Sequence, residues 1–168
     1  MSAYSLQRIK LGKKSKIIKT LSPNDMGETG SHQAGILVPK FPPDIVSFFP
    51  SLDSSKKNPR KSISFVDKQN QAWYFNFIYY NGRFFGGTRD EYRLTSMTPF
   101  FKFYGLKSGD DLILEKESMN EKDNYFVDFL RFGGNHVNFE GSKLKLSGSW
   151  RIIPVTKGDH RCCKKRLK

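Results

Sequence analysis

Cysteine is scarce in this chain of 168 residues. The two cysteines present, Cys162 and Cys163, are adjacent and close to the C-terminal end. Adjacent cysteines rarely form a relaxed disulfide with each other, and with only His160 nearby they make a poor zinc site. We interpret both as incidental thiols of an intracellular protein. The sequence therefore predicts neither a disulfide framework nor a structural metal.

Long apolar runs are also missing. No stretch approaches the roughly 20 apolar residues that a membrane-spanning helix needs, and the N-terminal residues lack the apolar segment of a signal peptide. Acidic residues are few, with 16 Asp and Glu against 29 Lys and Arg, so the formal net charge is +13. This balance predicts a polyanionic partner, with nucleic acid first and an anionic membrane surface second, and nothing else in the sequence favours a membrane.

Catalytic motifs are missing as well. A restriction-type nuclease site needs an acidic residue followed two positions later by lysine, so that carboxylates hold magnesium and the lysine supports the attacking water. No Asp or Glu in this chain has a lysine at that spacing. His-x-Lys and Gly-x-Ser-x-Gly are absent too. The sequence predicts a protein that binds nucleic acid and does not cut it, needing no cofactor of its own.

Aromatic residues are abundant, with 15 Phe and 7 Tyr, and short alternating segments are typical of β-structure. The patterns predict one mainly β domain over residues 17–157, a barrel or a sandwich, with Trp73, Phe75 and Phe77 in its core. A basic arm (residues 1–16) precedes it, and a basic tail (residues 158–168) follows it. We expect two short helices, at 44–49 and 99–104, and strands at 17–21, 36–38, 60–67, 72–80, 94–97, 112–115, 124–132, 144–146 and 150–155.

One stretch, residues 79–93, organises the functional prediction. An aromatic run enters an expected Asn81-Gly82 turn, and the chain then presents Arg89, Glu91 and Arg93 at alternate positions. Alternate residues of a strand lie on one face, so these three charges should project together. Two guanidiniums flanking a carboxylate suit a major groove, because arginine forks onto guanine and glutamate accepts from cytosine. The alternative is a solvated strand face with alternating charge.

A second stretch, residues 22–35, is dense in glycine and small polar residues and predicts a loop. Its side chains can donate and accept hydrogen bonds, and its glycines let backbone N–H groups approach an anion. It lacks the Gly-Lys-Ser/Thr ending of a nucleotide-binding loop. The carboxylate of Asp25 has two readings, either a cytosine acceptor or an Asx-turn residue.

Taken together, residues 18–35 and 79–93 resemble the two DNA-contacting arms of the EcoRII-type restriction endonuclease N-terminal domain, in the same order and at similar separation. Residues 106–114 also resemble a short signature of plant transcription-factor domains with the same fold. The resemblance implies a DNA-binding pseudobarrel of seven to eight strands with two short helices. It also implies a partner, double-stranded DNA of CCWGG type, gripped in the major groove by the two arms.

The same resemblance implies the setting of this chain. It would be the recognition domain of a prokaryotic, cytoplasmic type II restriction enzyme, monomeric when isolated. A separate nuclease domain of the same protein would use Mg²⁺. The family's effector-contact histidine matches His32, and its arginine–glutamate–arginine set matches Arg89, Glu91 and Arg93. Family lysines are replaced by Gly87 and Tyr92, and a family tyrosine by Leu37, which removes some contacts but leaves the reading set intact.

The residues expected to bind DNA fall into two groups. Base edges would be contacted by Asn24, Asp25, His32, Arg89, Glu91 and Arg93. Two alternatives stay open: Glu91 could instead hold an arginine in place, and His32 could bind a phosphate. The phosphate backbone would be contacted by Lys19, Thr29, Ser31, Arg83, Thr88 and Tyr92, and by the N-terminal lysines. Two other functions remain open at this point. One is a sequence-tolerant RNA- or single-strand-binding module that uses aromatic stacking, and the other is a small magnesium nuclease with an unorthodox site.

Overall fold

The computed structural model describes residues 13–29, 35–119, 122–132, 144–145 and 150–154. Its main feature is a single β-sheet with two short α-helices and one 3-10 helix. The strands are β1 (Lys13–Thr20), β2 (Gly35–Val38), β3 (Arg60–Val66), β4 (Ala72–Tyr80), β5 (Glu91–Thr95), β6 (Asp111–Met119), β7 (Lys122–Leu130), β8 (Leu144–Lys145) and β9 (Trp150–Ile153). The helices are α1 (Pro43–Phe48), η1 (Gly82–Phe85) and α2 (Thr98–Tyr104).

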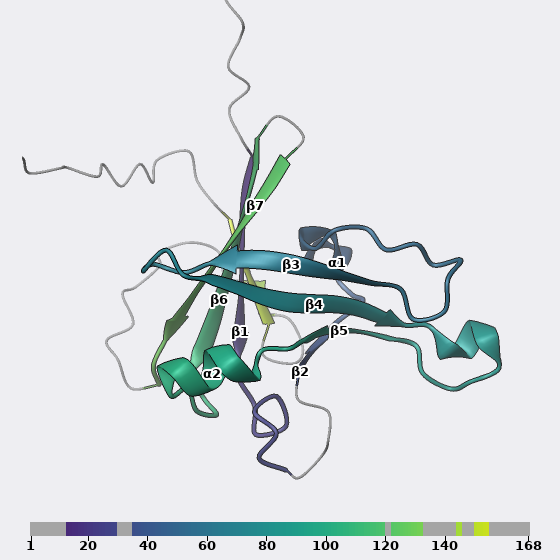
Figure 1. Ribbon diagram of the computed structural model, residues 1–168, viewed down its shortest axis with the longest axis horizontal. Coiled ribbons are helices and arrows are strands. Elements are labelled where there is room, and N and C mark those ends of the chain that lie inside the picture. Colours follow the sequence, from purple (N-terminus) through teal and green to yellow (C-terminus); the bar gives the residue numbers. More distant parts are fainter. Residues whose placement is uncertain (1–12, 30–34, 120–121, 133–143, 146–149, 155–168) are drawn as a thin grey trace, which may run out of the picture.

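The sheet is strongly bent into an open barrel. Its strand order is β2-β5-β4-β3-β7-β6-β1-β9-β8. The pairing of β3 with β7 is parallel and spans two residue pairs, Phe65 with Tyr125 and Val66 with Phe126, whereas the other pairs are antiparallel. At this short junction the strands β4 and β3 run across the direction of β7 and β6 (Figure 1). The sheet therefore consists of two halves that wrap around a common core.

Strand β4 shows why the core is aromatic. Its residues alternate, so that Trp73, Phe75 and Phe77 face inward and are buried, as predicted from the sequence. The ring of Phe77 stacks between two others: its centre lies 4.5 Å from that of Phe49 and 5.5 Å from that of Tyr92. Because these rings fill the barrel, the three β4 side chains are not a platform on which single-stranded bases could stack.

The two helices follow local sequence signals. Helix α1 has Pro43 in its first turn and ends just before Pro50, and it buries Ile45 and Phe48. Helix α2 ends at Gly105, whose φ of +58° lies in the left-handed region that favours glycine. The helix begins at Thr98, one residue earlier than expected, and its cap position, Met97, makes no side-chain hydrogen bond.

The buried carboxylate of Asp67 joins helix α2 to the β3–β4 turn. One of its oxygens accepts from the backbone N–H groups of Gln69 at 2.8 Å and Gln71 at 2.9 Å. The other accepts from the Trp73 indole at 2.8 Å and the Tyr104 hydroxyl at 2.5 Å. Burial raises the pKa of this carboxyl, but the donated hydrogen bonds outweigh that effect and hold the pKa below its usual value.

The mainly β fold with two short α-helices is confirmed. Nine strands are described, one at each of the nine segments expected from the alternation, whereas the resemblance implied seven or eight. Strand β1 begins at Lys13, so the boundary drawn after residue 16 falls inside the sheet. The basic tail at 158–168 lies outside the described residues. No helix in the described part of the chain is long and apolar enough to cross a membrane.

Candidate nucleic-acid interface

The loop between β1 and β2, which we call the first arm, starts with a tight structural turn. Ser22 and Asp25 form a reciprocal capping box: the Asp25 carboxylate accepts from the Ser22 backbone N–H at 2.8 Å, and the Ser22 hydroxyl accepts from the Asp25 N–H at 3.2 Å. The Ser22 hydroxyl also donates to the same carboxylate oxygen at 2.7 Å. The turn continues with the Glu28 N–H donating to the Pro23 carbonyl at 2.9 Å.

Lys19 completes this turn from strand β1. Its ammonium lies 2.8 Å from the Asp25 carboxylate and donates to the Thr20 carbonyl at 2.6 Å. Lys19 is 4% exposed and Asp25 is 5% exposed. The two side chains are thus occupied with each other beneath the arm. Of the two interpretations of Asp25, the structure shows the turn residue. Lys19, expected to contact a phosphate, is instead buried against Asp25.

The described surface of the first arm carries two of the remaining candidates. Asn24 and Thr29 are exposed, and the Thr29 hydroxyl donates to the Asn24 side-chain oxygen at 3.2 Å. His32 and Ser31 lie outside the described residues. The described turn therefore presents Asn24 and Thr29 at the surface and keeps Asp25 below it.

The connection between β4 and β5, which we call the second arm, differs from the expected Asn-Gly turn. Asn81 has φ of −100° and precedes the 3-10 helix η1, and the chain closes a wider loop. That loop is fixed by the Gly87 N–H donating to the Gly82 carbonyl at 2.7 Å and by the Arg83 N–H donating to the Arg89 carbonyl at 2.9 Å. A side chain at Gly87 would bring a Cβ to 3.2 Å from the Gly82 oxygen, which explains a glycine there.

The triad formed by Arg89, Glu91 and Arg93 is assembled as the alternation predicts. One Glu91 oxygen accepts from Arg89 Nε at 3.2 Å and Nη2 at 2.5 Å, and from Arg93 Nε at 3.0 Å. Burial raises the pKa of Glu91, while the hydrogen bonds from both arginines more than offset this and lower it overall. The carboxylate is therefore ionised and holds two guanidiniums in fixed positions on one face of the sheet.

Tyr80, on the neighbouring strand, supports the triad from below. It pairs in register with Glu91, and the guanidinium carbon of Arg89 lies 3.9 Å from the centre of its ring. This stacking geometry suits arginine better than lysine, since the guanidinium is planar and weakly hydrated. Tyr80 is not among the residues predicted to bind DNA, although the alternation of β4 places it on the outer face together with Ile78.

The two arginines of the triad differ in exposure. The side chain of Arg89 is 39% exposed and that of Arg93 is 11% exposed. Within the described residues the buried Nη1 of Arg93 has no hydrogen-bond acceptor. A buried donor without a partner costs about 1–3 kcal/mol. Because this atom is buried, a ligand could reach it only after the neighbouring side chains moved.

Tyr92 lies on the wrong face for its expected phosphate contact. Being one residue from both Glu91 and Arg93 in a strand, it points inward, where its ring stacks on Tyr79 at 4.2 Å. Burial, and then the nearby Asp90 charge, raise the pKa of the Tyr92 hydroxyl. The expectation for Tyr92 is therefore corrected: it supports the base of the second arm from the core side.

Asp90 ties the second arm to the end of β2. It accepts hydrogen bonds from the Lys40 ammonium and from the Tyr79 hydroxyl, the latter at 2.8 Å. Arg83 is farther away, with its guanidinium 3.8 Å from the other Asp90 oxygen and its side chain 71% exposed. Thr88 is exposed on the same arm. Arg83 and Thr88 thus remain accessible to a partner, whereas Asp90 is engaged within the protein.

Comparison with known proteins decides the family. The model of the N-terminal domain of restriction endonuclease EcoRII matches residues 13–133. This chain belongs to the EcoRII N-terminal domain family. The matched range begins at the first residue of β1 and includes both arms and the triad. The resemblance stated from residues 18–35 and 79–93 is therefore confirmed.

Two similar proteins show the extent of the likeness. Type II restriction enzyme EcoRII of Escherichia coli is 34% identical over 113 residues, which cover 62% of this chain and 26% of that enzyme. The match thus spans about a quarter of the enzyme's length. Among solved structures, the Arabidopsis FUS3–DNA complex is similar with a TM-score of 0.49 and 20% identity, over 68% of this chain and 94% of that chain.

In the described part of this EcoRII N-terminal domain, no three His, Cys, Asp or Glu side chains gather in a way that could hold a metal ion. The cysteines at 162 and 163 lie outside the described residues, as do His136 and His160. The second arm, by contrast, is described in full.

Proposed function

We propose that this EcoRII N-terminal domain binds double-stranded DNA sequence-specifically, with its two arms in the major groove of a CCWGG-type site. The observation that carries the proposal is the triad of Arg89, Glu91 and Arg93. Arginine forks onto the O6 and N7 atoms of guanine, and each half of CCWGG presents two adjacent guanines. Two guanidiniums held by one carboxylate match such a pair of guanines in number, and their N–H donors match the guanine acceptors.

The triad is also prepared for this task before DNA arrives. Glu91 fixes both guanidiniums, and Tyr80 stacks beneath Arg89. Fixing an arginine in advance reduces the entropy lost when it forms a bidentate contact. In this proposal Glu91 positions the two arginines. The same carboxylate can also accept a hydrogen bond from the N4 amino group of a cytosine.

Other residues would set the register of the domain on the duplex. The exposed Arg83 and Thr88 of the second arm, and Asn24 and Thr29 of the first arm, are accessible for phosphate or base-edge contacts. His32 and Ser31 keep the roles that the resemblance implies. The net charge of +13 supports attraction to a polyanion over a long range at low salt.

The wider assignment follows from the family. We infer that this chain recognises DNA without cleaving it, and that a nuclease domain elsewhere in the full-length protein performs a Mg²⁺-dependent cut. The isolated domain would be a monomer acting in the bacterial cytoplasm. The absence of acid-x-Lys and His-x-Lys patterns in the sequence supports a non-catalytic role for this chain.

Duplex binding at fixed, near-physiological salt tests the proposal. A CCWGG duplex, a one-base variant, a scrambled duplex and a single-stranded RNA are compared with Mg²⁺ present, and the products are checked for cleavage. Each mismatched base pair is expected to cost about 1–3 kcal/mol. Equal binding to all three duplexes, or tighter binding to the RNA, would instead identify a sequence-tolerant binder. Cleavage by this chain alone would identify a nuclease.

A further inference from the structure

The loop between α1 and β3 is locked to the second arm by one buried side chain. Asn81 is 0% exposed, and its amide donates to the carbonyl oxygens of Ser54 at 3.2 Å and Lys56 at 2.7 Å. Its side-chain oxygen accepts from the Asn58 N–H at 2.7 Å. Both N–H groups and the carbonyl oxygen of this buried amide are thus hydrogen-bonded to the loop. The loop and the second arm therefore form one rigid unit.

Strand β3 begins directly after this loop, and its first residue is Arg60. A backbone hydrogen bond from the Tyr79 N–H to the Pro59 carbonyl, 3.0 Å long, fixes the entry into the strand. Arg60 is exposed, and among the described residues it has no hydrogen-bond or ion-pair partner. A cation is therefore held at a defined place with its guanidinium uncommitted.

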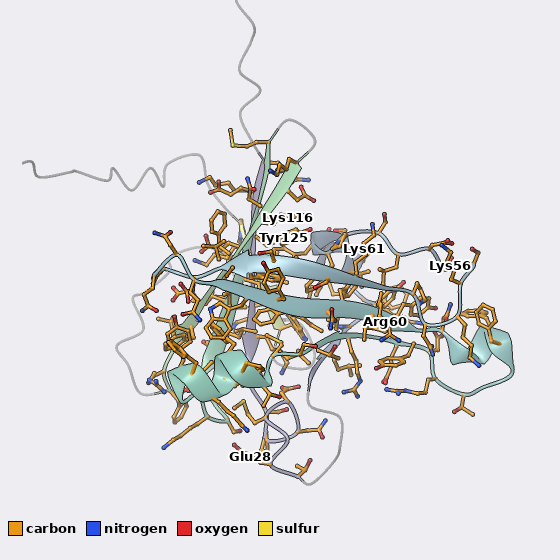
Figure 2. All side chains as sticks on the ribbon, viewed as in Figure 1. Glu28, Lys56, Arg60, Lys61, Lys116 and Tyr125 are labelled. Carbon is orange, nitrogen blue, oxygen red and sulfur yellow. The ribbon has the colours of Figure 1, made fainter. Side chains whose placement is uncertain are left out.

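Strand register places Arg60 on the same face as the triad. Arg60 pairs with Ile78, and Ile78 pairs with Arg93 on its other side. Paired residues of adjacent strands point to the same face of a sheet. Since neighbouring strands lie about 4.8 Å apart, the backbones of Arg60 and Arg93 are about 10 Å apart across the sheet. Lys61, one residue later, leaves β3 on the opposite side (Figure 2).

This separation decides what Arg60 can contact. The major groove of B-DNA is about 12 Å wide. If Arg93 reads a base edge inside the groove, a cation about 10 Å to the side lies at the rim of the groove, where the phosphates are. An arginine in that position would neutralise a phosphate and would carry no sequence information.

We propose that Arg60 is a third DNA contact of this domain, outside the two arms, which binds a backbone phosphate and is held in register by the Asn81 lock. The inference rests on the proposed function, because it takes the duplex to lie against the face that bears the triad. Its ligand is a phosphodiester of double-stranded DNA. It extends the contact surface by two strands beyond β5, across β4 to β3.

The salt dependence of binding by Arg60→Ala and Lys61→Ala tests the inference. The two residues are adjacent, exposed, equal in charge and without a described partner, but they face opposite sides of β3. Each lost phosphate contact reduces the slope of log K against log salt by about 0.9. We expect that reduction for Arg60→Ala, with a several-fold loss of affinity on CCWGG and scrambled duplexes alike. Lys61→Ala should bind as the wild type does, and Arg60→Lys should restore most of the slope.

The outcomes separate the two proposals. Equal slopes for Arg60→Ala and Lys61→Ala would overturn the inference and leave the triad untouched. A change in the ratio of CCWGG to scrambled binding for Arg60→Ala would overturn it as well, because it would indicate base reading. A wild-type chain that binds no duplex would overturn the proposed function and this inference together.

Discussion

The ammonium of Lys19 and the carboxylate of Asp25 lie 2.8 Å apart beneath the first arm, with about 5% of each side chain exposed. The arm is therefore organised by a buried ion pair, and the base contact expected of Asp25 is replaced by a structural role. A buried pair of this kind is costly to break, because the remaining charge is left without a partner.

The Asp25→Ala variant tests this role through stability. Removing one partner of a buried pair destabilises a fold by about 3–5 kcal/mol, so we expect a loss of that order in urea unfolding monitored by circular dichroism. The control is Asp53→Ala, because the pair between Asp53 and Lys56 is exposed to solvent and should contribute little to stability. A loss for Asp25→Ala as small as that for Asp53→Ala would contradict the structural role.

Glu91→Gln tests the positioning of the two arginines. The substitution keeps the shape of the side chain but removes the charge that holds both guanidiniums. We expect weaker binding to CCWGG and equal or tighter binding to a scrambled duplex, because one negative charge has left the interface. Competition binding at one salt concentration measures the ratio. If both duplexes lost affinity by the same factor, Glu91 would have no part in discrimination.

Tyr80 offers a matched pair of variants for the stack beneath Arg89. Tyr80→Phe keeps the aromatic face and should bind CCWGG like the wild type. Tyr80→Leu removes the face, and we expect it to lose about 0.5–1 kcal/mol of cognate affinity. Unfolding curves of both variants establish that the fold is retained. Identical cognate affinities for the two variants would show that the stack does not contribute to binding.

Asp67 should make the fold sensitive to acid. Its pKa in the folded protein is lowered, so the stabilisation is present above the usual carboxyl pKa of about 4 and is lost as the pH falls through the folded value. At pH values below 4, we expect the urea concentration at the unfolding midpoint to decrease more steeply for the wild type than for Asp67→Asn. If the midpoints of the two proteins decreased equally as the pH fell, the acid sensitivity would have to come from other carboxylates.

Period-two alternation predicted much of this molecule. It identified the buried aromatics of β4, and it placed Arg89, Glu91 and Arg93 on one face of the second arm. The same rule assigns Tyr92 to the other face, so the expected phosphate contact of Tyr92 contradicted a pattern already in use. The alternation also predicts the face of the sheet on which Tyr80 lies, but only the structure shows which cation lies over its ring.

Contacts between distant segments explain the other errors. Asn81-Gly82 favours a tight turn locally, but the Asn81 amide is engaged by a loop more than 20 residues earlier, and this tertiary contact determines the backbone. Ser22 and Asp25 have the spacing of a capping box, a local signal that identifies the turn. That Lys19 turns inward to pair with Asp25 depends on how β1 packs, which no short-range pattern reveals.

The two-pair junction between β3 and β7 has a mechanical consequence. The first arm leaves from β1 in one half of the sheet and returns through β2 in the other, whereas the second arm lies wholly within the half that contains β4 and β5. Few backbone hydrogen bonds join the halves, so the opening between the arms is set mainly by the side chains packed in the core. Substitutions at Phe65 or Tyr125, which lie in the core at this junction, would therefore change the spacing between the two arms.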